Sequence, residues 1–113
     1  RQVIMNLLNN AGDAMPEGGT ITIRSENIKA DGRTFVRIVV KDTGQGIEKG
    51  KLQKVFEPFF TTKKEGKGVG LGLSTSFTII ENHGGYISAK STLGKGTEFI
   101  IDLPVRLHKI EEI

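Results

Sequence analysis

Three polar residues lie on one line of a predicted helix, between rows of apolar residues. Asn6, Asn10 and Asp13 are spaced at i, i+4 and i+7, so a helix brings them to one face. A solvated helix face is the simplest explanation, but such faces usually carry Lys and Glu, and asparagine is a poor helix former. We therefore favour a functional line of amide and carboxylate groups.

A carboxylate followed by two glycines is the second candidate for chemistry. Asp42 ends a predicted strand and is followed by Gly44 and Gly46. Because glycine has no Cβ, a planar ligand can approach the carboxylate closely. An ionised carboxylate only accepts hydrogen bonds, so it would bind the exocyclic amine of adenine and reject the carbonyl of guanine. Taken alone, this motif is better explained as an ordinary Asp-x-Gly turn.

Glycines alternate over 66–72 and stop where a helix is predicted to begin. Their spacing excludes the Rossmann fingerprint and the P-loop, and the loop signatures of protein kinases are absent. Alternate glycines nevertheless expose backbone N–H groups, and a helix N-terminus adds partial positive charge and unpaired donors. We expect this segment to bind phosphate. A flexible linker is the alternative, but it does not explain why the glycines end at the helix.

The segment from 47 to 72 is predicted to be a lid over a nucleotide. Loops this long within a small domain are usually either functional lids or disordered. Between 49 and 67 there are six lysines and two acids, whereas the rest of the chain is close to neutral. Positive charge in the lid suits a small polyanion such as a triphosphate. We expect no nucleic-acid partner, because no recognition helix or aromatic RNA platform is visible.

The elements that position these motifs follow from hydrophobic periodicity and turn residues. The predicted helices cover residues 2–15, 48–55 and 72–83. The predicted strands are a half-buried one over 20–27, a more buried one over 35–41, and two more over 86–91 and 97–103. Asp31-Gly32 is the hairpin signal between the first two strands.

This order of elements predicts an α+β fold, a two-layer α/β sandwich in which about three helices cover one face of a mixed sheet. The 113 residues suffice for a single core, and 36% hydrophobic and 26% charged residues are typical of a globular domain. We expect one domain over 1–104 and a separate tail over 105–113. Because the chain starts inside a predicted helix, we expect it to be part of a longer protein.

Composition also limits the compartment and the chemistry. The chain has no cysteine, which excludes disulfides and thiolate metal sites and fits a reducing compartment. No apolar run approaches the roughly 20 residues that a membrane span needs. We expect the domain to work in the cytoplasm, whether or not the full-length protein is anchored in a membrane.

Five segments resemble, in the same order, the motif boxes of the catalytic domain of sensor histidine kinases. They are the N box Gln-Val-Ile-Met-Asn-Leu-Leu-Asn-Asn-Ala (2–11), the first glycine box Asp-Thr-Gly-Gln-Gly-Ile (42–47), the F box Phe-Glu-Pro-Phe-Phe-Thr-Thr-Lys (56–63), the second glycine box Gly-Val-Gly-Leu-Gly-Leu-Ser (68–74) and the last box Gly-Lys-Gly-Thr-Glu-Phe (94–99). The F box is the most discriminating, because related ATPases share the other boxes only loosely. The resemblance implies the Bergerat-type ATP-binding fold of gyrase B, MutL and chaperone ATPases.

The resemblance also implies two cofactors, ATP and Mg²⁺, and roles for single residues. Asn10 would bind the Mg²⁺ that bridges the phosphates, and Asp42 would bind the adenine amine with support from Thr97. Gly70 and Gly72 would meet the phosphates at the start of the helix. The full set of expected nucleotide-binding residues is Asn10, Asp13, Asp42, Gly44, Gly46, Ile47, Phe56, Phe60, Thr62, Lys63, Gly68, Val69, Gly70, Leu71, Gly72, Leu73 and Thr97.

Asn6 stands where gyrase-like ATPases, which resemble this helix, have a glutamate that activates water. Asparagine is not a base at neutral pH, so bound ATP would be preserved for a better nucleophile. We take Asn6 and Asn10 as the catalytic candidates, and the implied reaction is transfer of the γ-phosphoryl group to a histidine. Asp13 departs from the lysine of many histidine kinases and resembles the Asn-Ala-x-Asp-Ala version of other subgroups.

Neither histidine of the chain matches a family acceptor, which precedes an acidic residue on a helix. His83 precedes Gly84, and His108 precedes Lys109. We therefore expect the acceptor on an upstream dimerisation and histidine-phosphotransfer domain, a homodimeric full-length protein, and a response regulator receiver domain as an indirect partner. The chain by itself should bind ATP and phosphorylate little. An ATP-hydrolysing member of the fold and a nucleotide-dependent protein-binding module without catalysis are the alternatives.

Overall fold

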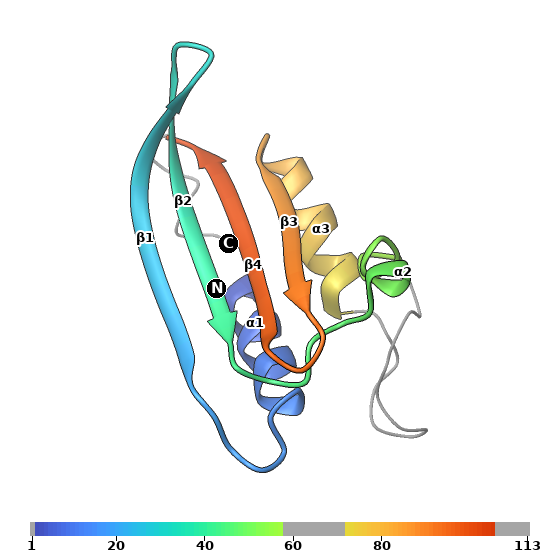
Figure 1. The fold of residues 1–113 in the computed structure, drawn as a ribbon. Helices are drawn as coiled ribbons and strands as arrows, with labels where there is room; N and C mark the ends of the chain where they lie inside the picture. Colours follow the sequence, from blue (N-terminus) through green and yellow to red (C-terminus); the bar gives the residue numbers. More distant parts are fainter. Residues whose placement is uncertain (1, 58–71, 106–113) are drawn as a thin grey trace.

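The computed structural model describes residues 2–57 and 72–105 (Figure 1). Residues 58–71 of the predicted lid and 106–113 of the predicted tail therefore lie outside the described residues. A four-stranded sheet forms one layer, and helices α1 and α3 lie behind it in the view of Figure 1. The prediction of an α+β fold with helices on one face of a sheet is confirmed.

Helix α1 (Gln2–Asp13) forms as its apolar spacing predicts, but it ends two residues early. Past Asp13, the N–H of Met15 bonds to the carbonyl of Gly12 at 3.1 Å. This i→i−3 bond is a tighter turn of the kind that often closes an α-helix. The apolar face of α1 packs against the core through Val3, Leu7 and Ala11, which are buried.

Strands β1 (Ile21–Ala30) and β2 (Arg33–Asp42) form the predicted hairpin. Asp31 and Gly32 occupy its two-residue turn with φ values of 51° and 75°. Positive φ at both positions is the mark of a type I′ turn, whose twist matches that of the flanking strands. The register runs to the pair Ile21–Asp42, so the hairpin carries Asp42 to the end of the sheet farthest from its turn.

Strand β1 was predicted to be half-buried, and this is wrong. None of its residues is buried, and Ile21 and Ile23 remain 38% and 51% exposed. The strand order is β1-β2-β4-β3, which puts β1 at an edge of the described sheet, and Figure 1 shows α1 behind β2 and β4 instead. Alternation predicts which side chains share a face, but not whether another layer covers that face.

The second half of the chain follows the predicted boundaries within one residue, except for its short helix. Its elements are α2 (Lys49–Leu52), α3 (Gly72–Asn82), β3 (Tyr86–Thr92) and β4 (Gly96–Pro104). Helix α2 has only four residues, whereas eight were predicted over 48–55. The chain continues past Leu52 in single turns, with the N–H of Lys54 bonded to the carbonyl of Lys51 at 2.9 Å.

The described sheet is antiparallel at each of its pairings, rather than mixed as predicted. Two hairpins supply the four strands, and each hairpin is antiparallel by construction. The segment between the hairpins brings β4 beside β2 in the antiparallel sense, so no parallel pair arises among the described strands. This arrangement places the end of β2, with Asp42, next to the start of β4.

The hydrophobic core lies between the helices and one face of β2, β4 and β3. Strand β4 is central, and every second residue from Thr97 to Leu103 is buried because strand side chains alternate between faces. The same buried cluster joins α1 and α3 to the sheet. Its members are Val3, Leu7, Val40, Ile80, Ile87, Phe99, Ile101 and Leu103.

Candidate functional site

The carboxylate of Asp42 is held at the end of β2, where the residue is 3% exposed. Its Oδ1 accepts hydrogen bonds from the backbone N–H groups of Gly44 at 2.8 Å and Thr97 at 3.2 Å. The described residues donate no bond to Oδ2, and none of their buried side-chain nitrogen or oxygen atoms lacks a partner. Because Oδ2 has no partner among these residues, it is not fully buried. The bonds to Oδ1 orient it to accept a donor from outside these residues.

The glycines beside Asp42 allow two other parts of the backbone to come close. A Cβ on Gly44 would lie 2.6 Å from the carbonyl oxygen of Ala14, just past α1. Gly46 has a φ of 76°, and its Cβ would overlap the carbonyl oxygen of Thr92 at the β3–β4 turn. In the structure, these glycines serve packing around the carboxylate. Close approach of a planar ligand to them remains a prediction.

We expect Gly46→Ala to destabilise the domain by about 1–3 kcal/mol, the usual cost of a strained φ at a non-glycine residue. The overlap with the carbonyl of Thr92 adds to this cost. Gly50→Ala is the matched control, because a Cβ at Gly50 meets nothing within 4 Å and alanine favours the helix. Equilibrium urea unfolding measures both variants. A Gly46→Ala midpoint equal to that of the wild type would contradict the packing described above.

Ser91 supports the same end of the sheet, and sequence reasoning missed it. Its hydroxyl accepts the N–H of Ile47 at 2.8 Å and donates to the carbonyl of Gly96 at 2.9 Å. It also lies 2.9 Å from the hydroxyl of Thr97. A serine has one proton to donate, so Thr97 is the donor in this pair. Only the register, which pairs Ser91 with Thr97, identifies this serine.

The predicted polar line lies on α1, and its first member, Asn6, contacts the start of α3. Asn6 and Asn10 are half-buried, and Asp13 is exposed. The Nδ2 atom of Asn6 donates to the carbonyl of Gly72 and to the hydroxyl of Ser76, each at 3.2 Å. The side chain of Asn10 makes no hydrogen bond with the described residues. Its amide is therefore available to a ligand.

Helix α1 spans the distance between the two ends of the candidate site. At Asn6 it contacts the first turn of α3. Just past its end, the carbonyl of Ala14 accepts the N–H of Gln45, in the loop that follows Asp42, at 3.2 Å. Asn10 lies four residues from both Asn6 and Ala14, and eight helical residues rise about 12 Å. A carboxylate acceptor, an amide and a helix N-terminus thus follow one another along α1.

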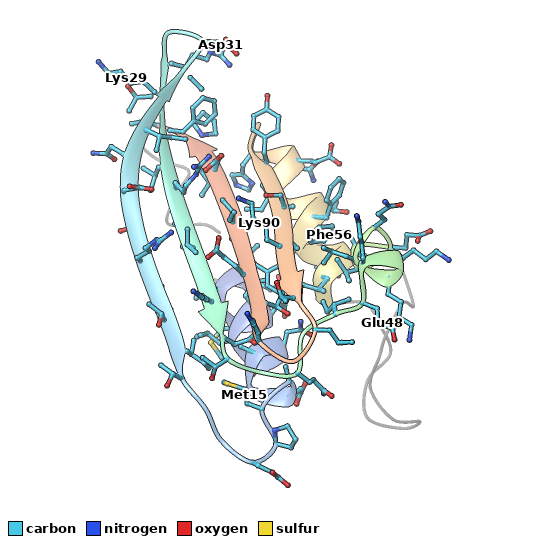
Figure 2. The ribbon with its side chains drawn as sticks, in the orientation of Figure 1. Met15, Lys29, Asp31, Glu48, Phe56 and Lys90 are labelled. Carbon is cyan, nitrogen blue, oxygen red and sulfur yellow. The ribbon has the colours of Figure 1, made fainter. Side chains whose placement is uncertain are left out.

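Three other predicted site residues use their groups within the protein. The ring of Phe56 lies 5.6 Å from that of Phe77 and 6.2 Å from that of Phe99, so it packs on the core beside α3 (Figure 2). Leu73 also packs against the core cluster. The N–H of Ile47 is bonded to Ser91. Contact of these residues with a nucleotide remains a prediction.

Seven predicted site residues cannot be placed in this arrangement, because they lie outside the described residues. They are Phe60, Thr62, Lys63, Gly68, Val69, Gly70 and Leu71. His108, one of the two histidines rejected as an acceptor, also lies outside them. His83 is described, and its Nδ1 lies 2.8 Å from the carbonyl of Ile79 at the end of α3.

A metal ion at this site would need ligands beyond the acidic and histidine side chains of the described residues. Within residues 2–57 and 72–105, no group of three or more His, Cys, Asp or Glu side chains could hold one. Mg²⁺ in nucleotide sites typically takes one or two protein oxygens and completes its shell with phosphates and water. The free amide of Asn10 fits such a sparse donor set.

None of the described helices is long and apolar enough to cross a membrane.

Comparison with known proteins identifies one family over nearly the whole chain. The family described as "Histidine kinase-, DNA gyrase B-, and HSP90-like ATPase" matches residues 1–107. Sensor kinase CckA of Brucella abortus is 51% identical over 91% of this chain and 12% of its own length. Sporulation kinase E of Bacillus subtilis is 48% identical over 94% of this chain and 14% of its own length. The chain therefore spans less than one sixth of each of these relatives.

Three solved structures share the fold. A mycobacterial sensor histidine kinase, MprB, has a TM-score of 0.79 and 30% identity, covering 93% of this chain and 69% of the other. Full-length ShkA in complex with AMPPNP has a TM-score of 0.72 and 31% identity, covering 91% of this chain and 20% of the other. Histidine kinase ThkA in complex with the response regulator TrrA has a TM-score of 0.71 and 38% identity, covering 98% of this chain and 28% of the other.

Proposed function

Because the chain belongs to the histidine kinase-, DNA gyrase B- and HSP90-like ATPase family, as the catalytic ATP-binding domain of a sensor histidine kinase, we propose that it delivers the γ-phosphoryl group of Mg-ATP to a histidine. The acceptor is supplied by a separate dimerisation domain. One observation carries the residue assignments. Along α1, the open Oδ2 of Asp42, the unpaired amide of Asn10 and the first turn of α3 follow in the order of base, metal and phosphate.

In this proposal, Asp42 selects adenine. Its Oδ2 accepts the exocyclic amine, while the N–H groups of Gly44 and Thr97 hold Oδ1. A guanine would present a carbonyl oxygen at the same place, and two acceptors would then face each other. The site should therefore prefer ATP to GTP.

The phosphates would meet the N-terminus of α3, which begins at Gly72. The first N–H groups of a helix have no partner within it, and the helix dipole adds partial positive charge there. Mg²⁺, held by the amide oxygen of Asn10 together with the phosphates, would neutralise charge during transfer. Transfer of a phosphoryl group depends mainly on such positioning and charge neutralisation.

Asn6 supports transfer to another protein group rather than to water. It is not a base, and its Nδ2 is committed to Gly72 and Ser76. It therefore supplies nothing that would activate a water molecule. The nucleophile would come from a histidine on the upstream dimerisation and phosphotransfer domain, in a homodimer, with a response regulator receiver domain downstream. The complex of the related kinase ThkA with the response regulator TrrA supports a response regulator as a partner.

The proposal assigns residues 1–104 to the catalytic domain, 47–72 to its lid and 105–113 to a tail. It also includes the contacts of the lid residues Phe60, Thr62, Lys63, Gly68, Val69, Gly70 and Leu71 with the nucleotide. We propose that the domain works in the cytoplasm on ATP and Mg²⁺, without a nucleic-acid partner.

Two measurements test the proposal. Calorimetric titration with ATP and GTP, each with Mg²⁺ or with EDTA, should give tighter binding of ATP that Mg²⁺ strengthens. The domain is then mixed with the kinase's own dimerisation and phosphotransfer domain and γ-labelled ATP. We expect label on that domain that is lost in acid and kept in base, as for phosphohistidine. Steady phosphate release without labelling would favour an ATPase, and ATP binding without either would favour a binding module.

A further inference from the structure

Ser76 is a polar residue inside the apolar contact between α1 and α3. It is 0% exposed and lies one turn from Ile80, which belongs to the hydrophobic core. Its hydroxyl donates to the carbonyl of Gly72 at 2.9 Å and accepts the Nδ2 of Asn6 at 3.2 Å. Asn6 also donates to the same carbonyl of Gly72. Three residues from two helices thus form one closed polar network.

A serine in a helix often bonds back to the carbonyl four residues earlier, so that bond alone means little. Thr78 makes such a bond to Ser74 at 3.1 Å on the exposed side of α3. Ser76 differs because its hydroxyl is fully buried and also takes the amide of another helix. The hydrogen bond from Asn6, rather than the bond within α3, therefore distinguishes Ser76.

The network lies between the two parts of the site that must act together. Gly72 is the first residue of α3, whose N-terminus is the proposed phosphate site. Asn6 is one turn before Asn10, the proposed metal ligand, on the same face of α1. A shift of α3 along α1 would change the distance between the metal ligand and the phosphate donors. The two hydrogen bonds from Asn6 cross between the helices and oppose this shift, while the bond from Ser76 to Gly72 within α3 orients the hydroxyl that accepts one of them.

We propose that Ser76 is a positioning residue, which through Asn6 and Gly72 holds the start of α3 at the distance from Asn10 that Mg-ATP requires. Asn6 accordingly acts by holding the helices rather than by touching the reacting groups. This inference rests on the proposed function, since it gives the network a role in metal-linked nucleotide binding.

The test compares ATP affinity with Mg²⁺ and with EDTA in the wild type, Ser76→Ala and Ile80→Val. Ser76→Ala removes the one hydrogen bond from Asn6 to Ser76 that joins the helices, and this loss should reduce the Mg²⁺ enhancement by about three- to tenfold. Relative to the wild type, the affinity of Ser76→Ala for ATP in EDTA should change by a smaller factor than its Mg²⁺ enhancement. Ile80→Val is the control, because it loosens the same helix face without touching a polar group. It should lower the unfolding midpoint and leave the enhancement unchanged.

A double-mutant cycle separates positioning from general stability. Asn6→Ala and Ser76→Ala remove the same network, so their effects on the Mg²⁺ enhancement should fall short of additive. Additive effects, or an unchanged enhancement in Ser76→Ala, would overturn the proposal. If Ser76→Ala fails to fold, Asn6→Ala at its half-buried site decides alone, and an unchanged enhancement there refutes the role. A wild type without Mg²⁺ enhancement would instead refute the proposed function.

Discussion

Asp42→Asn will weaken ATP binding by about 1–3 kcal/mol, the usual cost of losing a charged hydrogen-bond partner, or roughly ten- to hundredfold. The structure also predicts a change in base preference. The N–H groups of Gly44 and Thr97 need an acceptor, so the amide oxygen of the new side chain takes the place of Oδ1. Its NH₂ group then replaces Oδ2 and faces the adenine amine, donor against donor. Guanine offers a carbonyl there, so the preference for ATP over GTP should shrink.

The matched control for this variant is Asp31→Asn, at the exposed turn of the β1–β2 hairpin. Asparagine tolerates the positive φ of that position, and Asp31 lies at the far end of the hairpin from Asp42. Both variants lose one negative charge, so a general electrostatic effect would appear in both. Calorimetry with ATP and GTP measures affinity and preference together. An Asp42→Asn protein with the wild-type ratio of ATP to GTP affinity would remove Asp42 as the base-selecting residue.

Asn10→Ala will abolish the strengthening of ATP binding by Mg²⁺, so that its affinity with Mg²⁺ matches its affinity in EDTA. The reason is the sparse donor set around the site. The described residues contain no acidic or histidine cluster that could replace this amide as the protein ligand. Asn10→Asp should keep the Mg²⁺ dependence, because a carboxylate is also a Mg²⁺ ligand.

Asn9→Ala serves as the control for Asn10→Ala. Asn9 is the adjacent asparagine of the same helix, and it is exposed. The two substitutions change helix propensity by the same amount, so only the position on the helix differs. Titration of ATP over a range of Mg²⁺ concentrations is the measurement. If Asn10→Ala retained the wild-type Mg²⁺ dependence, the metal ligand would have to be sought elsewhere in the chain.

The sequence by itself determined the local elements and the family. Apolar residues at helical spacing predicted α1, and Asp31-Gly32 predicted the hairpin turn, because both signals depend on neighbours in the chain. The motif boxes pointed to the histidine kinase family, which the comparisons confirm. The sequence also pointed to Asp42 and Asn10 as site residues. The hydrogen bonds that hold the Asp42 carboxylate follow only from the structure.

Only the tertiary structure decided which residues act on one another. The bond from Thr97 to Asp42 spans 55 positions, and the bond from Asn6 to Gly72 spans 66. The first pair depends on strand order and register and the second on the packing of α1 against α3, and no local period encodes either. For the same reason, the alternation in β1 did not reveal that β1 is an uncovered edge strand, and nothing local distinguished Ser76 from a serine on an exposed helix face. Side-chain spacing sets which face a residue takes, whereas packing of distant segments sets what it meets there.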